Sequence, residues 1–284
     1  MVNFVKSEDF VHTFTTQKEH RDTETLILMS DLHIDSPFCN RKLLKEHLDY
    51  AKEHQYPVFI FGDVFDVMQG RNDPRRSMRE LKEIYKSDDY LDRVYEDVFN
   101  FLSPYRNNIA FVSYGNHEES VIKNAGIDLL KRLSRELGCV LGGFEGIIRL
   151  SFQRKDGKGG DNSFHIFYSH GASKNAVMTK GMLESVRKLI NTNSIADVQV
   201  FGDSHTAYVH WDSKYRLTNR GVLVYNKVAS IRLPSYEGLT PFMRRKGKAL
   251  PLNGCVELAI EYNNGKFDDF YLRDHLQSTL VFDE

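Results

Sequence analysis

The sequence predicts an α/β fold, in which buried strands alternate with helices that pack on them. Two observations carry this prediction. Short continuous apolar runs, as at 26–29 and 58–61, are typical of strands that are buried on both faces. Elsewhere, as at 90–102, apolar residues recur at the spacing of amphipathic helices. A strand, a helix and a strand over residues 26–61 would form a βαβ unit with a right-handed crossover.

The other elements follow in chain order. Residues 1–24 are polar, with one edge strand expected around 10–14. Asn40 is expected to cap the first helix, and Gly138 to end the third. Helices are expected at 41–54, 90–102, 129–137 and 182–190. Strands are expected at 147–152 and 164–168, joined by a hairpin at 154–161, and later near 208–211, 222–225, 256–260 and 267–272.

Length and composition bound the function. The chain has 284 residues, enough for one large domain over 1–284, and we find no repeat or linker. Its net charge of −1 provides no global attraction for nucleic acid or an anionic membrane. The cysteines Cys39, Cys139 and Cys255 are scattered, which disfavours a disulfide framework or a structural zinc site. We find no signal peptide or membrane span, so we expect a cytoplasmic protein that does not bind membranes.

Five apolar runs each end in a cluster of side chains that can bind metal, and three of the clusters have a glycine directly before the first such residue. Ligands collect at the carboxyl ends of strands in α/β sheets, so the clusters are expected to converge. Glycine allows the backbone to turn sharply or to approach a ligand closely. The clusters are Asp31 and His33, Gly62-Asp63 with Asp66, Gly115-Asn116-His117-Glu118, Ser169-His170-Gly171, and Gly202-Asp203-Ser204-His205.

Together these residue types suit a pair of divalent ions. Two ions bridged by a carboxylate can clamp the attacking and leaving oxygens of a phosphoryl displacement. Asp63 could be the bridging carboxylate. Imidazole, amide and carboxylate groups could complete the coordination of both ions. His117 is left beside Asn116, where it suits protonation of a leaving group or stabilisation of developing charge.

The ordered motifs, from Asp31-x-His33 to Gly202-x-x-His205, resemble the calcineurin-like metallophosphoesterase superfamily. They span residues 31–205, and the last 80 or so residues are covered only by the fold-level expectation. The resemblance implies a four-layer sandwich of two mixed β-sheets flanked by helices, and a hydrolase in which a metal-bound hydroxide attacks the phosphoester. It also implies an assignment of the ligands: Asp31, His33 and His205 for one ion, Asn116, His170 and Asp203 for the other, and Asp63 for both. We expect Asp66 and Glu118 to orient the ligands rather than to bind metal.

Two positions depart from the family pattern. Asp203 stands where the family has a histidine. If Asp203 binds, three ligand carboxylates would favour Mn²⁺ or Mg²⁺ over softer ions; alternatively it turns away and the second ion is weak. Val67 stands where protein phosphatases of the superfamily have an arginine, which disfavours a phosphoprotein substrate.

The substrate depends on basic segments outside the motifs. Arg71 and Arg75 lie in a charged stretch within 71–103, which is either a lid or helical insertion that reaches phosphate or a solvated segment. Residues 227–251 are expected to form a basic loop that either binds a nucleic-acid backbone or is merely solvated. Its candidate substrate contacts are Arg232, Arg244 and Arg245.

The favoured hypothesis is a phosphodiesterase or nuclease that acts on DNA, RNA or nucleotides. We expect two divalent ions, with manganese favoured and magnesium, iron or zinc as alternatives. One alternative is a phosphomonoesterase for a small nucleotide or sugar phosphate. Another is a scaffold that keeps the fold with weak catalysis, which the full set of candidate ligands disfavours.

Overall fold

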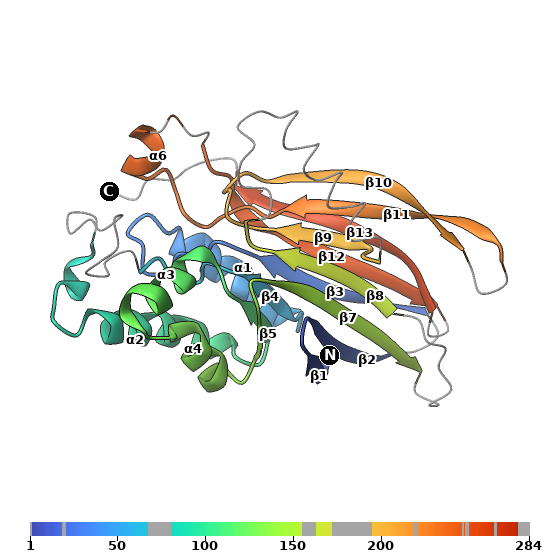
Figure 1. Cartoon of the computed structure of the whole chain (residues 1–284), viewed down its shortest axis with the longest axis horizontal. Helices are drawn as coiled ribbons and strands as arrows, with labels where there is room; N and C mark the ends of the chain where they lie inside the picture. The colour runs from blue at the N-terminus through green and yellow to red at the C-terminus, as the bar shows by residue number, and fades with distance from the viewer. Residues whose placement is uncertain are drawn as a thin grey trace.

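In the computed structural model, two mixed β-sheets face each other and helices cover the outer face of one of them (Figure 1). The structure describes residues 2–18, 21–67, 81–154, 163–171, 195–217, 221–245, 247, 250–263 and 266–277. These residues form three layers, helix, sheet and sheet, so the two mixed sheets are confirmed. The helix predicted at 182–190 lies outside the described residues.

The first sheet has seven strands, in the order β1-β2-β7-β8-β9-β11-β10. Its parallel pairs are β2 with β7, β8 with β9 and β9 with β11, and the other neighbours are antiparallel. The N-terminal region therefore supplies two strands where we expected one. The strands are β1 (Asn3–Glu8), β2 (Val11–Lys18), β7 (Glu145–Arg154), β8 (Ser163–Ser169), β9 (Val198–Phe201), β10 (Tyr208–Leu217) and β11 (Leu223–Arg232).

The second sheet has six strands, in the order β13-β12-β3-β4-β5-β6. Strands β3 to β6 are parallel, and β12 and β13 extend the sheet in antiparallel pairing. The expected βαβ unit is present, since α1 connects β3 to β4. The strands are β3 (Arg21–Met29), β4 (Val58–Phe61), β5 (Ile109–Ser113), β6 (Val140–Gly142), β12 (Asn253–Asn263) and β13 (Lys266–Gln277).

The helices begin and end where the sequence signals lie. Asn40 caps the first one, because its Oδ1 accepts a hydrogen bond from the backbone N–H of Leu43 at 3.1 Å. Gly138 ends α4 with a φ of 75°, in the left-handed region that glycine adopts easily. The helices are α1 (Arg41–Glu53), α2 (Tyr90–Leu102), α3 (Asn116–Ala125), α4 (Leu129–Leu137) and the short α6 (Pro241–Arg245), with 3-10 turns η2 (Glu83–Tyr85) and η3 (Ser103–Tyr105).

Two apolar cores explain the continuous apolar runs. Side chains alternate between the two faces of a strand, so β3 and β4 each contribute to both cores. Ile27 and Ile60 pack against the helices, whereas Leu28 and Phe59 pack between the two sheets. A strand with both faces buried needs apolar residues at every position, which is why these runs are unbroken.

Two expectations about the basic segments need correction. The predicted basic loop at 227–251 is not a single loop, because Lys227 and Arg232 belong to β11, and Arg244 and Arg245 belong to α6. The region 71–103 is not wholly a lid or insertion, because α2 packs its buried face against the helix-side core. Residues 68–80, including Arg71 and Arg75, lie outside the described residues.

Over the described part of the chain, none of the helices has both the length and the apolar character that crossing a membrane requires.

A partly buried histidine on α1, His47, allows a prediction about stability. The Nδ1 atom of His47 lies 2.7 Å from the hydroxyl of the fully buried Tyr236. Burial, and then the nearby His275, lower the pKa of His47 to about 4. The unfolded chain binds a proton near pH 6.5, so this histidine makes the native state less stable as pH falls from 6.5 towards 4.

We therefore expect His47→Gln to reduce the stability lost between pH 7.5 and pH 5 by roughly 1 kcal/mol, a value discounted for partial exposure. The measurement is urea unfolding at both pH values with a chelator present, so that metal binding adds no pH dependence. His54→Gln is the matched control, because His54 is exposed at the end of the same helix. Equal pH dependence in His47→Gln and the wild type would contradict the prediction.

Candidate metal centre

The clusters predicted from the sequence meet at one end of the two sheets. The parallel strands β3, β4 and β5 of one sheet and β8 and β9 of the other all deliver polar side chains there. The candidate ligands are Asp31 and His33 after β3, Asp63 after β4, Asn116 and His117 at the start of α3, His170 after β8, and Asp203 and His205 after β9. Ligand atoms lie within 4.8 Å of one another in three groups: Asp31, His33 and His205; His33, Asp66 and His117; and Asp31, Asp63 and His170.

The backbone at these strand ends is strained. Asp31, His33, Asp63, Asp203 and His205 have positive φ angles between 44° and 69°. Such conformations cost on the order of 1–3 kcal/mol each for residues other than glycine, and they cluster at functional sites. The strain is held in place by hydrogen bonds between neighbouring strand ends. The N–H of Asp31 donates to the carbonyl of Gly62 at 3.1 Å, and that of His33 donates to the carbonyl of Asp63 at 3.0 Å.

The three glycines that precede candidate ligands leave space that the ligands occupy. A Cβ atom on Gly115 would overlap the side chain and backbone of Asp63. A Cβ atom on Gly62 would overlap the ring of His170, and one on Gly202 would lie 2.7 Å from Nδ1 of the same ring. These glycines are therefore required because the ligands approach the backbone closely.

The first group surrounds Asp31, which is fully buried. Its Oδ1 lies 3.4 Å from Nε2 of His205, and both of its carboxylate oxygens accept from the backbone N–H of Asp203, at 3.0 and 3.1 Å. His33 is also buried, yet neither of its ring nitrogens makes a hydrogen bond with the described residues. Its Nδ1 faces the Asp66 carboxylate at 3.4 Å and its Nε2 faces Oδ2 of Asp63 at 3.9 Å, without forming a hydrogen bond to either. A buried imidazole that lies among carboxylates in this way fits a metal ion.

The second group surrounds Asp63. Its Oδ2 lies 3.1 Å from Nε2 of His170, whose Nδ1 bonds the carbonyl of Phe61 at 2.9 Å. The amide of Asn116 completes the group: with its nitrogen turned inward it donates to Oδ2 of Asp63 at 3.2 Å and to Oδ1 of Asp203 at 2.7 Å. With its oxygen turned inward, that amide faces carboxylate oxygens and an imidazole nitrogen. Such a set of electron-pair donors fits a divalent cation.

The electrostatics of the buried groups agree with this fit. Burial alone would raise the pKa of Asp63, but the charges of His170 and His117 outweigh it and hold that pKa well below its usual range. Burial alone would lower the pKa of His170, but the Asp63 carboxylate raises it to about 10. Each group therefore favours the charged form of the other, and the imidazoles compensate the buried carboxylate. A divalent cation could take over this role.

His117 and Asp66 lie beside the two groups. Nδ1 of His117 donates to the backbone carbonyl of Asp66 at 2.6 Å, which directs Nε2 towards Oδ2 of Asp63 at 3.9 Å. The carboxylate of Asp66 lies 3.3 Å from the His117 ring and 3.4 Å from the His33 ring. Burial lowers the pKa of His117, but Asp63 outweighs it and raises that pKa to about 9. The raised pKa favours a protonated His117 ring close to the Asp63 carboxylate.

Two buried carboxylates hold the strained backbone. Glu118 accepts hydrogen bonds from the N–H groups of Asp63, Phe65 and Gly115, at 3.1, 3.0 and 2.9 Å. Asp35 accepts from the N–H groups of the two residues at 66 and 67, at 2.6 and 2.9 Å. Burial raises the pKa of Glu118 to about 7 and that of Asp35 to about 6. Both act on the backbone that carries the candidate ligands.

The structure adds two residues to the site that the sequence analysis did not predict there, Asp35 and Glu237. Asp35 follows the first motif by two positions and has no signal of its own. Glu237 lies after β11 with its Oε2 atom 3.7 Å from Nδ1 of His205. The sequence does single out Glu237, because it is the one acidic residue in the basic stretch 227–248.

The candidate substrate contacts are placed differently. Arg232 is buried at the end of β11, with its guanidinium 5.2 Å from the ring centre of Tyr208 and 3.5 Å from Oγ1 of Thr206. It therefore lies beside the segment that carries Asp203. Arg244 and Arg245 are exposed on α6. Arg71 and Arg75 lie outside the described residues.

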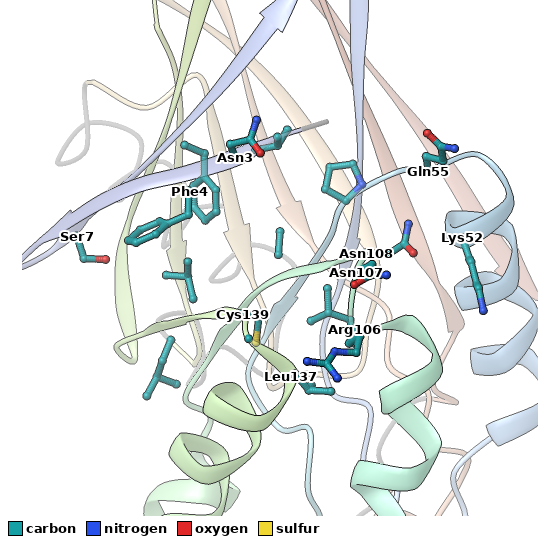
Figure 2. A pocket seen from close by; sticks show the side chains of 18 residues that line it. Asn3, Phe4, Ser7, Lys52, Gln55, Arg106, Asn107, Asn108, Leu137 and Cys139 are labelled. Carbon is teal, nitrogen blue, oxygen red and sulfur yellow. The ribbon is translucent and has the colours of Figure 1, made fainter.

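A cavity of about 910 Å³ lies at the opposite ends of the parallel strands. It is bordered by Pro57 before β4, Ile109 at the start of β5 and Val140 at the start of β6. Arg106, Asn107 and Lys52 are among its polar residues (Figure 2). None of the candidate metal ligands lines it, so this cavity is separate from the candidate metal centre.

The glycine geometry generates a prediction. We expect Gly115→Ala to lower the free energy of unfolding by roughly 1–3 kcal/mol, because Asp63 or the backbone must move to admit the methyl group. The displacement of Asp63 should also weaken Mn²⁺ binding by about 10–100-fold, as measured by calorimetric titration. Gly143→Ala is the control, because a Cβ atom there makes ordinary contact at 3.4 Å. Unchanged Mn²⁺ binding in Gly115→Ala would contradict the proposed crowding at Asp63.

Comparisons with known proteins bear on the fold alone. No model of a protein family matches the chain, and no curated protein matches it. A solved structure of a predicted phosphoesterase from Streptococcus pneumoniae is 14% identical, with a TM-score of 0.35 over 90% of this chain and 99% of its own. Vps29 from Chaetomium thermophilum is 9% identical, with a TM-score of 0.39 over 89% and 97%. GAP50, the anchor in the inner membrane complex of Plasmodium, is 12% identical, with a TM-score of 0.41 over 89% and 88%.

These scores are too low to carry an argument about function, and the motifs carry the resemblance instead. Their order along the chain and the two mixed sheets that bring them together are features of the chain itself. The two mixed sheets agree with the architecture that this resemblance implies, and membership of the calcineurin-like metallophosphoesterase superfamily stays a prediction.

Proposed function

We propose that the chain is a metal-dependent phosphoesterase that hydrolyses phosphodiester bonds of nucleic acid or nucleotides. One observation carries the proposal: electron-pair donors from five strand ends converge in a buried place, on a backbone strained to hold them. A protein with a purely structural role has no use for such an arrangement, because each buried carboxylate costs free energy unless it is paired.

The residues divide between two cations. Asp31, His33 and His205 would hold one, with Asp63 shared between the two. The other would be held by Asn116, His170 and Asp203. When bound, two divalent cations polarise the phosphoryl group and lower the pKa of a water molecule. The three ligand carboxylates make the site hard and anionic, which favours Mn²⁺ or Mg²⁺.

His117 supplies the proton that the leaving group needs. Its Nδ1 is engaged by the carbonyl of Asp66, so the proton available to the substrate is the one on Nε2, which faces Asp63. A protonated imidazole at this place also stabilises negative charge that develops on the leaving oxygen. Asp66 orients the ring and does not itself need to bind metal.

The preference for a diester rests on cations near the site. Arg232 lies beside the segment of Asp203, and α6 exposes Arg244 and Arg245 within the same basic stretch. Guanidinium groups bind phosphate oxygens in a two-pronged geometry, so they suit a polyanionic backbone. DNA, RNA or an oligonucleotide is therefore the proposed partner, and a phosphomonoester is the alternative that the assay distinguishes.

The test of the metal centre is titration of the metal-free protein with Mn²⁺ and turnover of two model substrates. We expect two bound ions and faster hydrolysis of bis-(p-nitrophenyl) phosphate than of p-nitrophenyl phosphate. Asp63→Asn should reduce kcat/KM by at least about 100-fold, because the shared carboxylate is lost. Asp212→Asn on β10 is the control. Activation by zinc alone would contradict the proposed metal preference, and no metal binding would contradict the proposed activity.

The proposed role of α6 gives a separate prediction. Replacing Arg244 and Arg245 by alanine should weaken binding of a single-stranded oligonucleotide. It should also reduce the slope of log K against log salt concentration by about 1 for each phosphate group that these arginines neutralise. The measurement is fluorescence anisotropy in the Asp63→Asn background, which prevents cleavage. Arg273→Ala, at an exposed position on β13, is the control. An unchanged salt slope would show that α6 does not contact the nucleic acid.

A further inference from the structure

Glu237 is a buried carboxylate at the candidate metal centre that belongs to none of the motifs. It lies in the segment that follows β11 and precedes α6, and only 7% of it is exposed. Burying a carboxylate is costly unless charged or hydrogen-bonded partners compensate it. Its neighbours therefore indicate what it does.

The side chain and backbone of Glu237 are held from several sides. Its Oε1 accepts a hydrogen bond from Oγ of Ser36 at 3.0 Å. Its N–H donates to Oγ of Ser235 at 2.8 Å, and its carbonyl accepts from Nδ2 of Asn253 at 3.1 Å. The carboxylate is thus fixed in place, and its second oxygen, Oε2, points to His205 at 3.7 Å.

The ring of His205 lies between two carboxylates. Its Nε2 faces Oδ1 of Asp31 at 3.4 Å, and its Nδ1 faces Glu237. This Nδ1 is buried and makes no hydrogen bond with the described residues. Turning the ring by enough to shorten the distance to Glu237 by about 1 Å would form one. Histidines that bind metal through one nitrogen commonly donate the other N–H to such a carboxylate.

We propose that Glu237 is a positioning residue that keeps the proton of His205 on Nδ1 and so leaves Nε2 free for the cation at Asp31. The inference rests on the proposed metal-dependent function. The same segment also fixes Asp31, because the N–H of Tyr236 and the hydroxyl of Ser235 donate to its carbonyl, at 2.9 and 3.0 Å. One C-terminal segment thereby positions two ligands of the same cation.

The experiment compares Glu237→Gln and Glu237→Ala with the wild type by calorimetric titration with Mn²⁺. We expect the affinity of one site to fall by about 10–100-fold in Glu237→Ala and by less in Glu237→Gln, which keeps an oxygen acceptor. The affinity of the other site, around Asn116 and His170, should change by less than about 2-fold, because positioning of His205 affects one cation.

Nitrogen-15 chemical shifts of His205 in the metal-free protein give a second readout. The wild type should show the Nδ1-protonated tautomer, and Glu237→Gln should show a mixture. Glu257→Gln is the matched control, because Glu257 is another buried carboxylate that pairs with a histidine, at 3.0 Å from Nε2 of His275 on β13. It should leave both readouts unchanged.

The outcomes separate this inference from the proposed function. If the wild type binds two ions and both Glu237 variants bind them equally well with an unchanged His205 tautomer, the positioning role is overturned and the metal centre stands. If the wild type binds no Mn²⁺, the proposed function and the inference both fail. If Glu237→Ala does not fold, Glu237→Gln decides the question, because it has nearly the same size and hydrogen-bonding capacity.

Discussion

The buried charge of Asp63 is the constraint on which the rest of the site depends. A carboxylate with 1% exposure is stable only if cations and hydrogen-bond donors surround it. Here they come from distant parts of the chain: the ring of His170 from one sheet, and the ring and backbone N–H of His117 from the helix after β5. The charge of Asp63, which follows β4, therefore links side chains from both sheets at the ends of their strands.

The convergence of the candidate ligands also explains the strained backbone at the strand ends. Ligands can point inward together only if the backbone turns sharply at each strand end, which puts non-glycine residues at positive φ. Glu118 and Asp35 stabilise these turns by accepting hydrogen bonds from the N–H groups that they expose. The carboxylates that hold the backbone are thus as much a part of the candidate site as the carboxylates proposed to bind the cations. Their raised pKa values are a result of the burial that this role requires.

Local patterns made most of the fold predictable. The apolar runs of β3 and β4, the cap at Asn40 and the stop at Gly138 depend on a few neighbouring residues, so the sequence displays them directly. The roles of Asp35 and Glu237 depend on segments that meet only in the folded chain. The sequence shows Glu237 as a single acid in a basic stretch, but it does not show which residues either carboxylate contacts. The basic loop was wrong for a related reason. Buried residues such as Val228 and Ile231 continue β11 through a stretch whose charged residues suggested a loop.

Asp203, which stands where the resembled family has a histidine, has a backbone that is held by Asp31. The backbone N–H of this residue donates to both carboxylate oxygens of Asp31, so the turn is fixed whatever side chain it carries. Relative to the histidine of the family that the motifs resemble, an aspartate here differs mainly in the charge that it brings to the candidate site. The negative charge of Asp203 lies near Arg232, a buried cation on the neighbouring strand. Burial lowers the pKa of Arg232, and Tyr208 and Asp203 oppose this effect. If Asp203 binds metal as proposed, the added carboxylate would favour a hard divalent ion, and the guanidinium of Arg232 would favour a phosphate oxygen on the same side.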